Sequence, residues 1–303
     1  VDDGELKLDL EASFPLPHTG ETVLALLLTD HQAVIQSACW AFLRERRFFV
    51  RGGYGDGSLV FGTIDDEAAC CLPQAHAASV TAVALSQECA RAVPEANGLL
   101  LLTGACDGTL NVWAASDALW RKFVPVLRWQ LHSGAVRCVD FGDPFGLAVS
   151  CGDDGLVHIS RLRPPAQPVR TFLFAGAAAV SEARFGARAP ATVVACSIEA
   201  RQICVWALQG FLLATLDFPA SSAVRGLRVF SDFDAREGLI CSMDDPTGAG
   251  SLEFRSLPYL HLIWRRPCTM SLRPTALDAA PSREIVWVGH EDGSIEAIFA
   301  RSR

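Results

Sequence analysis

Two adjacent carboxylates and a nearby imidazole form a group of side chains that can do chemistry. Asp153 and Asp154 stand in the segment GDDGLVHI, and His158 follows four residues after Asp154. Hydrolysis by general acid and base catalysis needs convergent groups whose pKa values are separated. On one short strand Asp154 and His158 would share a face, but the pattern places no nucleophile beside them. We therefore predict no catalytic residue, and a hydrolase is the alternative.

Other patterns for chemistry are weak or missing from the sequence. It contains no serine elbow, phosphate-binding loop, HExxH motif or EF-hand. Its 11 cysteines are irregularly spaced without a CxxC pair, which predicts a reducing, cytoplasmic location and no zinc or disulfide framework. Asp244 and Asp245 lie in a glycine-rich stretch that can hold calcium, although a solvated hairpin is favoured. We predict no metal and no cofactor.

Composition limits the classes of partner. Half of the 303 residues are hydrophobic, and the formal net charge is -8 at pH 7. This acidic balance argues against nucleic acid as a partner, because phosphate contacts need a concentrated basic face. No uncharged stretch is apolar enough to span a membrane. The first residue is valine, so we expect the chain to be a fragment of something longer.

An Asp-Gly turn recurs along the chain. The segments GDGSLVF, CDGTLNVW, DDGLVHI and EDGSIEAIF align at four turn aspartates, Asp56, Asp107, Asp154 and Asp292. Two weaker copies, EARQICVW and TGAGSLEF, fill the gap, and the spacing between successive turns is 42 to 51 residues. That period fits a unit of four short strands, about 40 to 45 residues long.

Strand signals within the repeats agree with this period. The second repeat predicts strands at residues 80–86, 99–105, 109–114 and 126–131, and the third at 136–141, 147–151, 156–162 and 169–174. Segments such as LLLLTG and LAVSCG are apolar on both faces, so each sheet must be sandwiched between neighbours. We predict an all-β propeller over residues 33–303 with six readable repeats. Residues 1–32 are predicted to be a linker, a closing strand or a short helix.

The order of these segments resembles one known family. FFVRGGYGDGSLVF, LLLLTGACDGTLNVW, LAVSCGDDGLVHI, LQGFLLATLDF and VWVGHEDGSIEAIF are similar to the C-terminal WD40 propeller of BEACH-domain proteins, the neurobeachin-like group in particular. The similarity covers about residues 20–303 and departs at Gly55, where a bulky aromatic is expected. The resemblance implies seven blades and a non-catalytic scaffold linked to vesicle trafficking or membrane sorting. It also implies a cytoplasmic location, peripheral to intracellular membranes.

The WD40 pattern implies a role for four polar residues of the second repeat. In that pattern a histidine, a Ser or Thr, the turn Asp and a Trp form a hydrogen-bonded chain, and the candidates are His76, Thr103, Asp107 and Trp113. We expect Asp107 to cap its turn and to accept a hydrogen bond from His76, so that its role is structural.

The third repeat departs from that pattern at one position. It keeps His132, Ser150 and Asp154 but has Ser160 where the second repeat has Trp113. We therefore expect its chain of hydrogen bonds to be broken, because serine cannot supply the indole N–H at that place.

Loops longer than a minimal repeat are the candidate binding surfaces. One of them, residues 116–125, contains Trp120, Arg121 and Lys122, and aromatic and arginine side chains are enriched at binding hot spots. The alternative is that Trp120 folds back onto its own blade. The segment RRFF (46–49) weakly resembles a phosphoinositide-binding motif, so a lipid-binding propeller is another alternative. We predict protein partners, and membrane association only through other domains.

Overall fold

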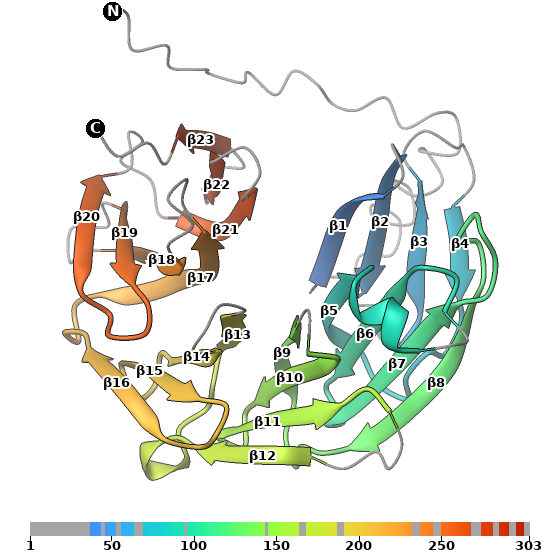
Figure 1. The fold of residues 1–303 in the computed structure, drawn as a ribbon, viewed down its shortest axis with the longest axis horizontal. Coiled ribbons are helices and arrows are strands. Elements are labelled where there is room, and N and C mark those ends of the chain that lie inside the picture. The colour runs from blue at the N-terminus through green and yellow to red at the C-terminus, as the bar shows by residue number, and fades with distance from the viewer. Residues whose placement is uncertain are drawn as a thin grey trace, which may run out of the picture. The chain divides into compact units, whose positions relative to one another are not determined.

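The computed structural model describes the chain as a succession of short antiparallel strands (Figure 1). The described residues are 37–43, 46–52, 56–63, 69–93, 96–142, 145–163, 168–186, 191–231, 237–244, 250–267, 274–280, 285–290 and 295–299. The predictions for residues 1–32, Asp245 and Asp292 lie outside these ranges.

Two compact units divide the chain, one formed by residues 14–187 and the other by residues 188–303 together with 1–13. The first unit holds three four-stranded sheets, whose strands are hydrogen-bonded in the orders β1-β2-β3-β4, β5-β6-β7-β8 and β9-β10-β11-β12. Its strands are β1 (Ser37–Leu43), β2 (Arg46–Gly52), β3 (Leu59–Thr63), β4 (Ala69–Leu72), β5 (Val80–Ser86), β6 (Leu100–Ala105), β7 (Thr109–Ala115), β8 (Phe123–Gln130), β9 (Val136–Gly142), β10 (Leu147–Gly152), β11 (Leu156–Arg161), β12 (Pro168–Leu173) and β13 (Glu182–Gly186).

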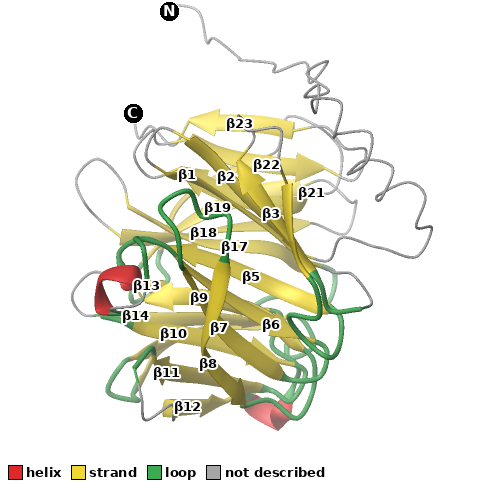
Figure 2. Ribbon diagram, turned by 90° about the vertical axis from the view of Figure 1, so that its right-hand side faces the viewer, coloured by secondary structure: helices red, strands yellow, loops and turns green. Residues whose placement is uncertain are grey.

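The strands after residue 188 are β14 (Thr192–Ser197), β15 (Gln202–Ala207), β16 (Leu212–Asp217), β17 (Ala223–Ser231), β18 (Glu237–Asp244), β19 (Gly250–Ser256), β20 (Leu262–Pro267), β21 (Pro274–Ala280), β22 (Ile285–His290) and β23 (Ile295–Phe299). They form a four-stranded sheet ordered β17-β18-β19-β20 and a sheet of three described strands ordered β21-β22-β23, and strands β14 to β16 belong to a sheet ordered β13-β14-β15-β16. Figure 2 shows that helix is limited, within the described residues, to short turns, η1 (Cys89–Ala92) and η2 (Ala175–Ala177).

The described strands form six sheets, as many as the readable repeats, and the all-β class is confirmed. Predicted and observed strands coincide over β5 and differ by a residue or two in most others of the second and third repeats. The seventh blade that the family resemblance implies is not among the described residues and stays an expectation.

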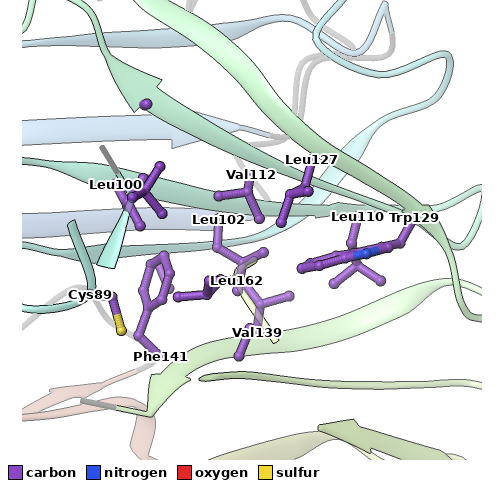
Figure 3. Close-up of a cluster of buried hydrophobic side chains, with 14 of the residues drawn as sticks. Cys89, Leu100, Leu102, Leu110, Val112, Leu127, Trp129, Val139, Phe141 and Leu162 are labelled. Carbon is purple, nitrogen blue, oxygen red and sulfur yellow. The ribbon is translucent and has the colours of Figure 1, made fainter. Parts of the chain in front are cut away.

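The core of the first unit lies between its sheets (Figure 3). Every residue of β6 is buried, and alternate side chains enter different clusters. Leu100 and Leu102 pack with Phe141 and other residues of the third sheet, whereas Leu101 packs with Phe61 of the first sheet. Each fully buried leucine contributes roughly 1.5 to 3 kcal/mol. Burial of both faces explains why a single sheet of this sequence needs neighbours.

One strand boundary differs clearly from the prediction. The sequence places a break before residue 126, but β8 begins at Phe123 and contains Pro125. Pro125 pairs with Trp113 beside an irregularity in the β7–β8 register. Because β8 is the outermost strand of its sheet, proline can lie there without removing a needed ladder hydrogen bond.

Candidate functional site

Three of the predicted turn aspartates form hydrogen bonds within their own turns. Asp56, Asp107 and Asp154 each accept a hydrogen bond from the backbone N–H two residues later in the chain. The donors are Ser58 N at 3.0 Å, Thr109 N at 3.0 Å and Leu156 N at 3.1 Å. An Asp side chain that binds the backbone two residues on stabilises a tight turn between two strands.

The carbonyl oxygen of the glycine after each of these aspartates accepts a hydrogen bond from the loop that leads into the next sheet. Gly57 and Gly108 have φ of 73° and 79°, a region that favours glycine. The carbonyl oxygen of Gly57 accepts from His76 N at 3.1 Å, and that of Gly108 accepts from His132 N at 3.3 Å. A Cβ atom on Gly108 would lie 2.1 Å from the His132 carbonyl oxygen. The Asp-Gly pair therefore holds both its own turn and the histidine of the following repeat.

His76 is the centre of a buried polar network in the second sheet. Its Nε2 atom lies 2.7 Å from Thr103 Oγ1, and its Nδ1 atom lies 2.7 Å from Thr109 Oγ1. Trp113 Nε1 donates to Thr103 Oγ1 at 3.0 Å, and the Thr109 hydroxyl donates to Asp107 Oδ1 at 2.5 Å. The network thus contains the four residues that the WD40 pattern implies, with Thr109 as a fifth member.

The hydrogen bonds of this network have one consistent direction. Burial lowers the pKa of His76 to about 4, helped by Arg128 and opposed by Asp107, so the ring is neutral at pH 7 and carries one N–H. The Asp107 carboxylate only accepts, so Thr109 donates to it and must itself accept from His76 Nδ1–H. His76 Nε2 then accepts from the Thr103 hydroxyl.

The chemistry of Asp107 fits this direction. Burial by itself would raise its pKa, but the two hydrogen bonds from Thr109, with His76 and Arg128 nearby, outweigh that effect and lower the pKa below its ordinary value. The carboxylate is therefore ionised at neutral pH, as an acceptor at the end of the chain must be.

The predicted direct contact between Asp107 and His76 is corrected by the structure. The Thr109 hydroxyl stands between them, because residue 109 carries an Oγ1 within reach of both groups. Thr109 is the third residue of the segment DGT, but it is not one of the four residues of the WD40 pattern.

The third sheet shows the arrangement without that hydroxyl. Leu156 occupies the position of Thr109, and His132 Nδ1 lies directly against Asp154, 2.9 and 3.1 Å from the two carboxylate oxygens. Asp154 also accepts from Ser133 N at 3.0 Å, and His132 Nε2 lies 2.9 Å from Ser150 Oγ. The pKa of Asp154 is lowered: burial would raise it, but these hydrogen bonds and His132 outweigh burial.

At the tryptophan position of this sheet the network ends, as expected. Ser160 is buried, and its hydroxyl has no hydrogen-bond partner in the structure. Another polar side chain, His158, lies across the ladder from Ser150 and was not predicted to join the network. Its ring meets that of His132 edge-on, with centroids 4.7 Å apart, and its Nδ1 atom lies 2.9 Å from Thr171 Oγ1.

The electrostatic setting of His158 keeps its ring neutral. Burial lowers its pKa to about 4, and His132 acts in the same direction, whereas Asp154 and the Leu131 backbone act in the opposite one. A neutral imidazole has one nitrogen available as a hydrogen-bond acceptor or as a metal ligand.

The position of Trp120 agrees with the alternative that it folds back onto its own blade, and not with the expectation that it is an exposed binding residue. Its side chain is 2% exposed, packs in a cluster with Phe123, and donates from Nε1 to the Asn97 carbonyl oxygen at 3.1 Å. Burial of a large indole whose N–H has a partner is strongly favourable, so the loop folds back onto its own sheet. Arg121 and Lys122 remain exposed.

The suggested lipid motif lies in a strand. Residues 46–49 form the first half of β2, which pairs with both β1 and β3, so their backbone is not an exposed edge loop. Within the described residues, no helix combines the length and apolar character needed to cross a membrane.

Comparisons with known proteins agree with this architecture. Residues 69–114 and 123–159 match the family model for the WD domain, G-beta repeat. A chain in the crystal structure of the mitotic checkpoint complex is similar in fold, with a TM-score of 0.71 and 17% identity over 90% of this chain and 79% of that chain. No curated protein sequence matches. The chain is therefore an all-β propeller that contains WD40 repeats.

Proposed function

We propose that this chain is a non-catalytic scaffold that binds other proteins through its loops. The polar groups that first pointed to hydrolysis are engaged within the fold. Asp153 accepts two hydrogen bonds from Arg137, at 2.5 and 2.7 Å, and Asp154 accepts from two backbone N–H groups and lies against His132. Carboxylates that are engaged by such hydrogen bonds are better suited to stabilising the fold than to transferring protons.

The observation that carries the proposal is the ordered loop between β7 and β8. Asp117 Oδ1 accepts from Leu119 N at 2.9 Å and from Arg121 N at 3.0 Å, and Ser116 N donates to the Lys122 carbonyl oxygen at 2.9 Å. Because the loop is already ordered, binding through it costs little conformational entropy.

Three exposed side chains of this loop define the proposed contact surface, Leu119, Arg121 and Lys122. The buried indole of Trp120 lies among them in the sequence and anchors the loop, whereas Leu119 is 44% exposed. An apolar side chain beside two cations favours a protein partner with an acidic patch around a small apolar pocket.

We further propose that the chain is the C-terminal propeller of a BEACH-type protein that takes part in vesicle trafficking or membrane sorting. The support is the order of the five sequence segments, and membrane association would come through other domains. The sequence that precedes Val1 in the intact protein tests this proposal. A BEACH domain there would support it, and its absence would leave a WD40 scaffold of another class.

Affinity capture with a charge-reversed loop tests the scaffold proposal. The variant is Arg121→Glu with Lys122→Glu, and the matched control is Arg170→Glu, an exposed arginine on β12. We expect the loop variant to lose specific partners that the wild type and the control both retain, with all three proteins equally folded. Identical partner sets for all three would contradict the assignment of this loop.

A further inference from the structure

Three buried side chains of the third sheet converge on one point. The potential ligand atoms of His132, Asp154 and His158 all lie within 4.8 Å of one another. The two histidines are 2% and 6% exposed, and the Asp154 side chain is 7% exposed. We propose that these three residues bind a divalent transition-metal ion of the zinc type. Imidazole nitrogen and carboxylate oxygen are ligands that Zn²⁺ accepts together.

The strongest sign of a ligand is an unused nitrogen. His158 Nε2 is buried and has no hydrogen-bond partner, while Nδ1 of the same ring is engaged with Thr171. The Leu131 backbone acts on the ring as a hydrogen-bonding neighbour that raises its pKa, but Nε2 has no partner with full hydrogen-bond geometry. A buried polar atom without a partner costs roughly 1 to 3 kcal/mol, and a metal ion would satisfy it.

In each histidine, the ring nitrogen that would not bind the metal lies within hydrogen-bond distance of a hydroxyl group. Ser150 Oγ lies 2.9 Å from His132 Nε2, and Thr171 Oγ1 lies 2.9 Å from His158 Nδ1. Each hydroxyl can accept the N–H of a ring whose other nitrogen binds metal, which fixes the tautomer. The ion would displace the proton of His132 Nδ1 to solvent, and Nε2 would take up a proton from solvent and donate it in a hydrogen bond to Ser150 Oγ, so that the ring stays neutral.

The geometry requires only local adjustment. Bonds of about 2.1 Å to a tetrahedral ion place two ligand atoms about 3.4 Å apart. His132 Nδ1 and Asp154 Oδ1 are already 2.9 Å apart, so the main adjustment is the approach of His158, whose ligand atom lies within 4.8 Å of the other two. The fourth position would be taken by water.

The second sheet provides an internal comparison. At the position that matches His158 it has Asn111, and Thr109 separates its histidine from Asp107. It therefore lacks both a second imidazole and the direct contact between histidine and carboxylate. The sequence predicted no metal because the three ligands come from a loop, a turn and a strand, with no motif spacing. The proposal goes beyond the scaffold function and does not depend on it.

Titration of the full chain with Zn²⁺ tests the proposal. Exposed thiols such as Cys71 and Cys106 are first alkylated, because free cysteines also bind zinc. Calorimetry is then compared for the wild type, His158→Asn and a control, His261→Asn, which removes an exposed histidine of the second unit. We expect one Zn²⁺ site in the wild type and the control, and at least tenfold weaker binding in His158→Asn.

Co²⁺ absorption provides the second readout, since a four-coordinate nitrogen and oxygen site gives visible bands that are much more intense than those of the octahedral aqueous ion. His158→Asn should fold, because the second sheet has Asn at this register, and His158→Gln is the substitute if it does not. Wild-type protein that binds no Zn²⁺, or equal binding in the wild type and the His158 variant, would overturn the proposal.

Discussion

Thr109 determines how the histidine of the second repeat is held. Its hydroxyl accepts from His76 and donates to Asp107, so the hydrogen bonds run in one direction from the Trp113 indole to an ionised carboxylate. In the third repeat leucine replaces this threonine, and the histidine meets the carboxylate directly. One hydroxyl therefore separates a relayed network from a direct pair.

Removal of that hydroxyl should destabilise the fold. In Thr109→Val the His76 Nδ1–H loses its acceptor within a buried site, which we expect to lower the free energy of unfolding by about 1 to 3 kcal/mol. Urea unfolding measures the change. Thr215→Val, at an exposed position of β16, is the control and should change stability by less than about 0.5 kcal/mol. Equal effects of the two substitutions would contradict the relay.

The burial of His76 predicts how stability depends on pH. Its pKa is about 4 in the folded state and about 6.5 when exposed, so the unfolded chain takes up the proton first as pH falls. Stability should be full above about pH 6.5 and should decrease toward pH 4, by about 3 kcal/mol from this residue. His158, whose pKa is also lowered to about 4, adds to the same decrease, so His76→Asn should reduce the slope of the urea-unfolding profile across that range without removing it, and the exposed His261→Asn should leave the slope unchanged. An unchanged slope in His76→Asn would contradict this account.

Each Asp-Gly turn joins one sheet to the next at the scale of the elements. The Gly108 turn connects β6 to β7, and its carbonyl oxygen holds the backbone of the loop that leads into β9. That loop carries His132, whose side chain then binds within the third sheet. The same short motif thus sets the position of the following repeat's polar network.

The close approach at this turn predicts a large effect of one methyl group. Gly108→Ala places a Cβ atom 2.1 Å from a backbone oxygen and forces alanine to a φ of 79°, so we expect a loss of about 3 kcal/mol or more. Gly176→Ala is the matched control: its φ is 68°, but no atom lies within 4 Å of the added carbon. It should cost about 1 to 2 kcal/mol. Melting temperatures measure both, and equal losses would show that the contact is unimportant.

Local signals account for what the sequence predicted well. Strand β5 and the turns at Asp107 and Asp154 follow from residues that are adjacent in the chain. The burial of Trp120 and the place of His158 depend on partners far along the chain, so composition and spacing could not reveal them. The sequence predicts that β8 begins after Pro125, whereas the strand includes this proline. An outermost strand tolerates proline, and the sequence does not show which strand is outermost.

At the scale of the whole molecule, buried residues stabilise the fold, and exposed residues are the ones that we propose to bind partners. Apolar strands buried on both faces require neighbouring sheets, and the histidine and aspartate networks fix the turns between them. Exposed side chains of the loops, such as Leu119, Arg121 and Lys122, are then free to vary without loss of the fold. Our account therefore assigns the repeated polar residues to the framework and the binding of partners to the loops.

Asp107→Ala tests this division most directly, by the set of partners that the folded variant captures. We expect it to lose about 1 to 3 kcal/mol of stability, because it removes the acceptor at the end of the buried network. Under conditions where it remains folded, it should capture the same partners as the wild type, whereas Arg121→Glu with Lys122→Glu should not. An Asp107→Ala protein that keeps full stability but loses its partners would contradict the account.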